Sequence, residues 1–143
     1  MLFANVFHVI SLLLVPTVIG QTAVSVTYDT TYDLGTNSLN IVACSNGVNG
    51  LESKGYTTFG SLPNFPNIGG SFAVPGWNST GCGTCWNVTY DDTTVTVLAI
   101  DTAEDGFNLS EEAMNTLTDN QAVALGSVTA TAVQVDASLC GLP

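Results

Sequence analysis

The sequence is almost without positive charge. Its 143 residues include one lysine, Lys54, and no arginine, against twelve acidic residues, so the formal net charge is −11. Nucleic-acid binding needs lysine and arginine side chains that neutralise phosphates, and this composition therefore excludes a nucleic-acid partner. Adhesion to an anionic lipid surface is disfavoured for the same reason.

Histidine is nearly absent as well, and the single one, His8, lies in an apolar N-terminal stretch. Residues 1–20 are typical of a signal peptide: a short apolar run, followed by small residues. The run is shorter than the roughly 20 apolar residues that a membrane span needs. We expect cleavage after Gly20, with cleavage after Ala23 as the alternative and a buried core helix as the competing interpretation. The expected product is secreted and not embedded in a membrane.

Removal of residues 1–20 leaves a chain without histidine. This excludes Ser-His-Asp and Cys-His catalysis, and it excludes zinc sites of the His-Glu-x-x-His type. Any acid–base chemistry would then depend on carboxylates. We predict no metal and no cofactor.

Charged residues are only 9% of the chain, whereas hydrophobic residues are 45%. This balance is typical of a folded domain and not of a disordered segment. The length suits one domain, and no composition shift marks a boundary within residues 21–143. We therefore predict a single domain over this range.

Four cysteines are present: Cys44, Cys82, Cys85 and Cys140. An even number in a small exported chain predicts two disulfides, and spacing alone permits three pairings. A redox or zinc site at Cys82 and Cys85 is the alternative. Thioredoxin-like sites begin a helix, however, whereas the residues after Cys85 have the pattern of a β-hairpin.

The hydrophobic pattern predicts a β-rich domain. Alternation at 24–28 and the β-branched residues at 39–44 and 128–135 indicate strands, and residues 84–90 and 94–100 indicate a hairpin. The glycine- and proline-rich stretch 55–83 is predicted to be a long ordered loop held by its aromatic side chains. Two short helices are expected, one at 51–54 and one at 111–118, the latter capped by Ser110. A closed barrel would leave no exposed sheet edge.

Several segments resemble the cerato-platanin family of small secreted fungal proteins. They include Val-Ser-Val-Thr-Tyr-Asp at 24–29, Cys-Ser-Asn-Gly at 44–47, Cys-Gly-Thr-Cys-Trp at 82–86 and Gly-Phe-Asn at 106–108. The segments follow the order of the family and span nearly all of the chain after residue 20. The cysteine motif, together with the two other cysteines, makes the resemblance specific.

The resemblance implies a mainly β fold, a six-stranded double-ψ β-barrel with one or two short α-helices, shared with the first domain of expansins. It also implies the pairings Cys44–Cys82 and Cys85–Cys140. Family members act outside the cell and at the fungal cell wall. They bind chitin-type N-acetylglucosamine oligomers, chitin or cellulose, loosen such material without hydrolysis, and elicit defence responses in plants, which implies a plant receptor as a partner. The expected protein is a non-enzymatic monomer capable of self-association.

The central acidic residue of the family corresponds to Asp101, which we expect at a strand end facing a surface groove. The predicted residues for binding or loosening polysaccharide are Asp101, Tyr28, Ser45, Asn46, Gly47, Gly106, Phe107 and Asn108. The competing interpretation of Asp101 is a hydrogen bond to its own loop. Glycoside hydrolysis needs two carboxyl groups about 5–10 Å apart, and only Glu104 and Asp105 lie near in sequence.

Flat aromatic faces often carry sugars, so the tyrosines and tryptophans are further candidates. Trp86, next to a cysteine, is predicted to lie in the core, whereas Trp77 is left open between core and surface. Three sequons mark candidate N-glycosylation sites at Asn78, Asn87 and Asn108, of which Asn78 is favoured.

Two functions from different classes remain. One is a wall protein that binds neutral polysaccharide and is sensed by plants. The other is a surface-active protein that self-assembles as a coat on hyphae, which a weakly charged surface favours and a net charge of −11 opposes. Because of that charge, binding should depend on neutral sugars.

Overall fold

The computed structural model describes residues 21–143, and the predicted signal peptide, residues 1–20, lies outside the described residues. Six strands close into a barrel in the order β1-β5-β2-β4-β3-β6. The pairs β1–β5 and β2–β4 are parallel, and the other four pairs are antiparallel. The predicted six-stranded barrel is thus confirmed. The strands are β1 (Thr22–Tyr28), β2 (Ile68–Ser71), β3 (Cys85–Tyr90), β4 (Thr93–Thr102), β5 (Phe107–Leu109) and β6 (Ser127–Val135).

The barrel core is formed by strands in which buried apolar residues alternate with outward-facing residues. Val24 and Val26 of β1 are buried, as are Val95 and Val97 of β4, while the residues between them face outward. Burial of each such side chain stabilises the fold by about 1.5–3 kcal/mol. The hairpin register pairs Val88 with Val95, so apolar side chains of neighbouring strands meet in one layer.

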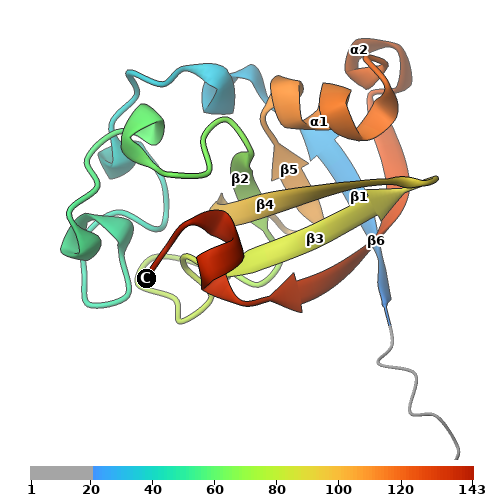
Figure 1. The fold of residues 1–143 in the computed structure, drawn as a ribbon. Coiled ribbons are helices and arrows are strands. Elements are labelled where there is room, and N and C mark those ends of the chain that lie inside the picture. The colour runs from blue at the N-terminus through green and yellow to red at the C-terminus, as the bar shows by residue number, and fades with distance from the viewer. Residues whose placement is uncertain (1–20) are drawn as a thin grey trace, which may run out of the picture.

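Short helices surround the barrel. Figure 1 shows α1 lying across one end of it, while the 3-10 helices and loops between β1 and β2 gather at one side. None of the helices within residues 21–143 is long and apolar enough to cross a membrane. The helices are α1 (Glu111–Thr118), α2 (Ala122–Leu125), η1 (Thr30–Asp33), η2 (Leu39–Ile41), η3 (Leu51–Lys54), η4 (Phe59–Ser61) and η5 (Ala137–Cys140).

Two segments differ from the sequence prediction. Residues 39–44, predicted as a strand, instead begin with the 3-10 helix η2, because the Ser38 side chain accepts a hydrogen bond from the Asn40 N–H and starts a turn. Residues 55–83, predicted as loop, contain strand β2. Its Gly69 hides the strand signal, yet a Cβ there would lie 2.2 Å from the Asn108 carbonyl oxygen, so only glycine fits between the neighbouring strands.

Both predicted disulfides are confirmed. Cys44–Cys82 joins the loop after η2 to the loop before β3, and Cys85–Cys140 ties η5 to the start of β3. The two bridges therefore hold different parts of the molecule. The first fixes two surface loops against each other, and the second fixes the C-terminal segment to the barrel.

Helix α1 begins as predicted at Ser110, whose buried hydroxyl oxygen accepts from the Ala113 N–H at 3.0 Å and donates to the Pro66 carbonyl at 2.6 Å. Ser110→Ala should lower the free energy of unfolding by about 2 kcal/mol, since it removes the cap of α1 and leaves the buried Ala113 N–H without its acceptor. Urea unfolding measures the change. Thr116→Ala, on the exposed face of the same helix, is the control and should change stability by less than about 0.5 kcal/mol. Equal stability of the Ser110 variant and the native protein would contradict the assignment.

Candidate functional site

The carboxylate of Asp101 is the centre of a hydrogen-bond network at the end of β4. Its Oδ1 atom accepts from the backbone N–H of Ala43 at 3.0 Å and of Thr102 at 2.8 Å. Its Oδ2 atom accepts from the Tyr32 hydroxyl at 2.9 Å. Asp101 thus bonds to the next residue of its own strand and to two segments far away in sequence, whereas the competing prediction placed a bond within the following loop.

Tyr32 is a buried partner that the sequence offered only as one aromatic ring among several. Burial, followed by the charge of Asp101, raises the pKa of the Tyr32 phenol well above its ordinary value. Tyr32 therefore stays protonated and keeps donating to Asp101 in neutral and mildly alkaline solution. A carboxylate offers about four acceptor positions, so Asp101 retains capacity for one further donor.

The loop that begins at Ala43 is fixed from both ends. The Cys44 N–H donates to the Ile100 carbonyl beside Asp101, and the Glu52 N–H donates to the Ser45 carbonyl. Ser45 is buried, whereas Asn46 is exposed. The loop that contains the predicted residues Ser45, Asn46 and Gly47 is therefore a direct continuation of the Asp101 network.

A second loop lies against the first and carries Trp77. The indole Nε1 of Trp77 donates to Asn46 Oδ1 at 2.7 Å. The next residue, Asn78, accepts from the Asn49 N–H through its side chain at 3.0 Å and from Asn49 Nδ2 through its carbonyl at 2.9 Å. The Cys44–Cys82 bridge joins the bases of the two loops. We call residues 43–50 and 76–82 the paired loops.

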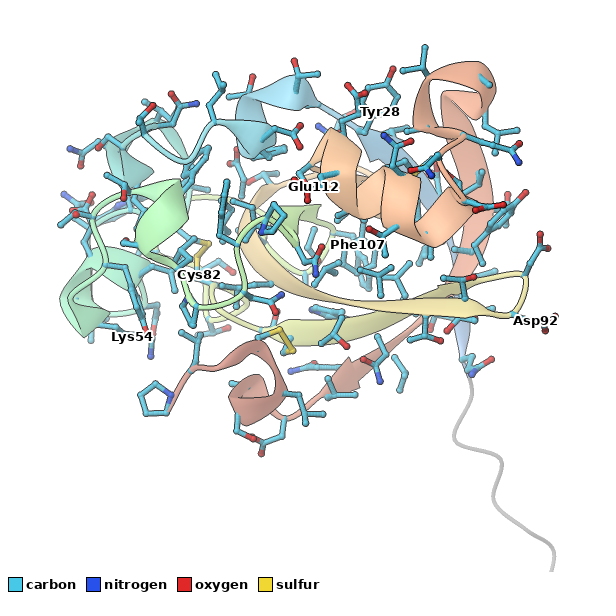
Figure 2. The ribbon with its side chains drawn as sticks, turned by 45° about the horizontal axis from the view of Figure 1, so that its top comes forward. Tyr28, Lys54, Cys82, Asp92, Phe107 and Glu112 are labelled. Atoms are coloured by element: carbon cyan, nitrogen blue, oxygen red, sulfur yellow. A yellow bond between two sulfur atoms is a disulfide. The ribbon has the colours of Figure 1, made fainter. Side chains whose placement is uncertain are left out.

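The other predicted residues lie on the strands. Phe107 is 1% exposed and packs edge-on against Phe72 and Trp86, so its ring faces the core and no surface ligand reaches it. Figure 2 shows Tyr28 beside α1 and away from Cys82. Tyr28 is partly buried against the core. These two rings are thus not brought together with the paired loops.

Gly106, just before β5, and Asn108, within β5, both make structural contacts with β1. Gly106 has a φ of +62°, and a Cβ there would lie 1.9 Å from the Ser25 carbonyl oxygen, so glycine allows close contact with β1. Gly70 of β2 pairs with Asp101 of β4 on one side and with Asn108 of β5 on the other. Asp101, Gly70 and Asn108 therefore lie in one row across the sheet. Asn108 Oδ1 accepts from the Thr27 hydroxyl at 3.0 Å. Asn108 is therefore the one β5 candidate that shares a sheet row with Asp101.

The hydrogen-bond partners of Asp101 are two backbone N–H groups and a phenol, and the charge of a second carboxylate, Asp29, acts on the same phenol. Glu104 and Asp105 are exposed in the turn between β4 and β5. Within residues 21–143, no group of three or more histidine, cysteine or acidic residues is placed to hold a metal ion. The arrangement offers fixed hydrogen-bond acceptors around Asp101.

A hollow of about 530 Å³ lies elsewhere, between η1 and α1, where Asp33, Glu111 and Glu112 are among its lining residues. Asp33 caps α1, because its carboxylate accepts hydrogen bonds from the N–H groups of Glu111 and Glu112. The sequence analysis did not predict this cap. Neither Asp101 nor any residue of the paired loops lines this hollow. The hollow is therefore separate from the candidate site.

The three sequons occupy different settings. Asn78 lies in a paired loop, Asn87 in β3 with Oδ1 accepting from the Thr96 hydroxyl, and Asn108 in β5. Glycan occupancy stays a prediction for all three. A glycan at Asn78 would adjoin Trp77, the exposed ring that the sequence left unassigned.

Comparisons with known proteins place the chain in a family. The sequence profile described as Cerato-platanin matches residues 24–142. The chain is 51% identical over 117 residues to the allergen Asp f 15 of Aspergillus fumigatus, covering 82% of this chain and 76% of that protein. It is 39% identical over 131 residues to cerato-platanin of Ceratocystis fimbriata f. sp. platani, covering 89% and 93%.

Solved structures agree with the sequence comparisons. The crystal structure of cerato-platanin 2 from M. perniciosa superposes with a TM-score of 0.81 at 45% identity, covering 85% of this chain and all of that one. The chain is likewise similar to the solution structure of the fungal elicitor Cerato-Platanin, with a TM-score of 0.73 at 40% identity and coverage of 81% and 95%. The barrel, the two disulfides and these matches together show that the chain belongs to the cerato-platanin family.

Proposed function

We propose that this chain is a secreted, non-catalytic protein that binds neutral chitin-type polysaccharide of the fungal cell wall and loosens its packing. The observation that carries the proposal is the Asp101 network, in which one carboxylate holds a distant loop through the Ala43 N–H and bonds to the buried Tyr32 phenol. Because both carboxylate oxygens are engaged in these structural hydrogen bonds, Asp101 is suited to fixing the loop surface that meets the polymer.

The paired loops favour neutral sugars. Residues 43–50 and 76–82 contain no charged side chain, and their surface combines amide, hydroxyl and backbone groups with the exposed side chains of Val48 and Trp77. The acidic residues, all of which lie outside these loops, give the molecule a strong negative charge, which repels anionic polymers. N-acetylglucosamine oligomers, chitin and cellulose are neutral and rich in hydroxyl groups, so they suit such a surface.

Loosening follows from competition for hydrogen bonds. Polymer chains in chitin and cellulose are held together by bonds between hydroxyl and amide groups. A rigid protein surface that offers the same groups can replace some of these bonds without breaking a glycosidic bond, because its loops are already ordered and lose little entropy on binding.

Plant recognition is the second element of the proposal. The family includes a structure described as a fungal elicitor, to which this chain is 40% identical. We infer that a plant receptor senses the folded, disulfide-bonded chain outside the fungal cell. Leaves infiltrated with the folded protein should respond, and leaves infiltrated with the reduced, unfolded chain should not.

Asp101→Asn tests the proposed loosening activity. The asparagine oxygen can still accept from the backbone N–H groups, but the carboxylate charge and one acceptor are lost, so loosening of filter paper or chitin should fall to the background level. Asp92→Asn is the matched control, since it removes one negative charge at the far hairpin turn, where Figure 2 shows Asp92 well away from Cys82. Unchanged loosening by the Asp101 variant would remove this residue from the mechanism, and reducing sugar released by the native protein would indicate a hydrolase.

A further inference from the structure

The two tryptophans of the chain lie in opposite environments. Trp86 is 8% exposed and packs against Phe72 and Phe107. Trp77 is 63% exposed although it belongs to a loop fixed by a disulfide and several hydrogen bonds. A large aromatic side chain normally gains stability through burial, and an ordered loop instead holds the Trp77 ring in water, where its flat face is available to a ligand.

The orientation of the Trp77 ring is fixed by Asn46. An indole N–H can only donate, so the Asn46 atom 2.7 Å away must be the amide oxygen, Oδ1. The Asn46 amide nitrogen, Nδ2, takes no part in that bond. Because the Asn46 side chain is exposed, Nδ2 lies at the edge of the indole ring where a ligand can reach it. The pair thus presents a flat apolar face and a hydrogen-bond donor next to each other.

The loops beneath the ring are tightly fitted. Gly47 has a φ of +89°, and a Cβ there would lie 2.6 Å from Asn78 Oδ1 and 3.2 Å from Trp77 Cζ2. Glycine at this position therefore lets the first loop close against the second. Together with the two bonds between Asn49 and Asn78, this contact orders the ring before any ligand arrives, which lowers the entropy cost of binding.

We propose that Trp77 and Asn46 form a stacking subsite for one pyranose ring of a neutral polysaccharide with equatorial substituents. The C–H face of such a sugar lies flat on the indole, and a sugar hydroxyl or acetamido oxygen accepts from Asn46 Nδ2. The absence of charged side chains from residues 43–50 and 76–82 matches an uncharged ligand. This inference rests on the proposed function and names the contact through which the paired loops take the polymer.

Binding assays test the subsite with four variants. Trp77→Ala should weaken binding to insoluble chitin about tenfold, and Trp77→Phe should weaken it less because a ring remains. Asn46→Asp keeps the acceptor for the indole N–H but removes the Nδ2 donor, so it should weaken chitin binding without moving the emission maximum of the free protein. Leu139→Ala, at a residue 61% exposed on η5, is the matched control and should bind as the native protein does.

Tryptophan fluorescence gives a direct readout, because Trp77 is the exposed one of only two tryptophans. Titration with the soluble N-acetylglucosamine hexamer should shift the emission of the native protein to shorter wavelength. The same titration should leave the emission of Trp77→Phe, which reports Trp86 alone, unchanged. Circular dichroism verifies that each variant is folded.

The outcomes separate the two proposals. If the native protein binds chitin and Trp77→Ala binds it equally well, the subsite is overturned and the proposed function stands. If the native protein binds neither chitin nor the hexamer, the proposed function fails and the subsite falls with it. If Trp77→Ala keeps its sugar affinity but no longer self-associates in light scattering, Trp77 instead contacts a second copy of the chain, which also overturns the subsite.

Discussion

Asp101→Ala should lower the free energy of unfolding by about 3 kcal/mol and abolish binding to chitin. The substitution leaves three donors without their acceptor: the N–H groups of Ala43 and Thr102 and the buried hydroxyl of Tyr32. A partly buried donor left unpaired costs about 1–3 kcal/mol, and water can reach the more exposed of these three. Binding is lost because the first of the paired loops loses its bond to Asp101 and is held on β4 only by the Cys44 N–H bond to the Ile100 carbonyl.

Asparagine at the same position separates the contributions to stability and function. Asp101→Asn supplies an oxygen for Ala43 and Thr102, so it should cost only about 1 kcal/mol while loosening activity is lost. Urea unfolding of both variants, followed by chitin binding at a temperature where each is folded, measures the two effects. An alanine variant as stable as the native protein would contradict the anchoring function of Asp101.

The largest effect is expected from removal of a disulfide. Replacing both Cys44 and Cys82 with serine opens a loop with a sequence separation of 38 residues. The chain-entropy estimate for a loop of this size is a loss of about 4 kcal/mol, a large part of the roughly 5–15 kcal/mol that stabilises a typical domain. Because this bridge joins the bases of the paired loops, chitin binding should be lost as well.

The second bridge provides a matched control. Replacing Cys85 and Cys140 with serine opens a loop with a separation of 55 residues and should also cost about 4 kcal/mol. This bridge ties η5 to β3 and does not touch the paired loops. The variant should therefore melt at a similarly reduced temperature but bind chitin normally when folded. Equal loss of binding in both double variants would show that overall stability, and not the loop geometry, controls binding.

The parts of the fold that depend on local sequence could be predicted. The hairpin of β3 and β4 and the capped helix α1 follow from alternation, β-branched residues and Ser110. Strand β2 could not be predicted, because its Gly69-Gly70 pair lacks strand propensity and fits only through close contact of Gly69 with β5 and of Gly70 with β4. The disulfide pairing came from the family resemblance, since spacing alone left three possibilities.

The candidate site was only partly predictable for a related reason. Asp101 and the Cys-Ser-Asn-Gly loop were identified from the family motifs, and the barrel places them side by side. The bonds from Tyr32 to Asp101 and from Trp77 to Asn46 join residues 69 and 31 positions apart, which no local pattern reveals. Phe107 shows the opposite case, because its motif suggested a site whereas alternation in β5 turns its ring into the core.

The central claim is that the paired loops, next to Asp101, are the surface that takes neutral polysaccharide. Amide resonances of the ¹⁵N-labelled protein, recorded during titration with the soluble N-acetylglucosamine hexamer, test it most directly. We predict saturable shifts at residues 43–50 and 76–78 and at the Trp77 indole N–H, with no new reducing ends in the sample. Shifts confined to the hollow between η1 and α1, or none at all, would contradict it.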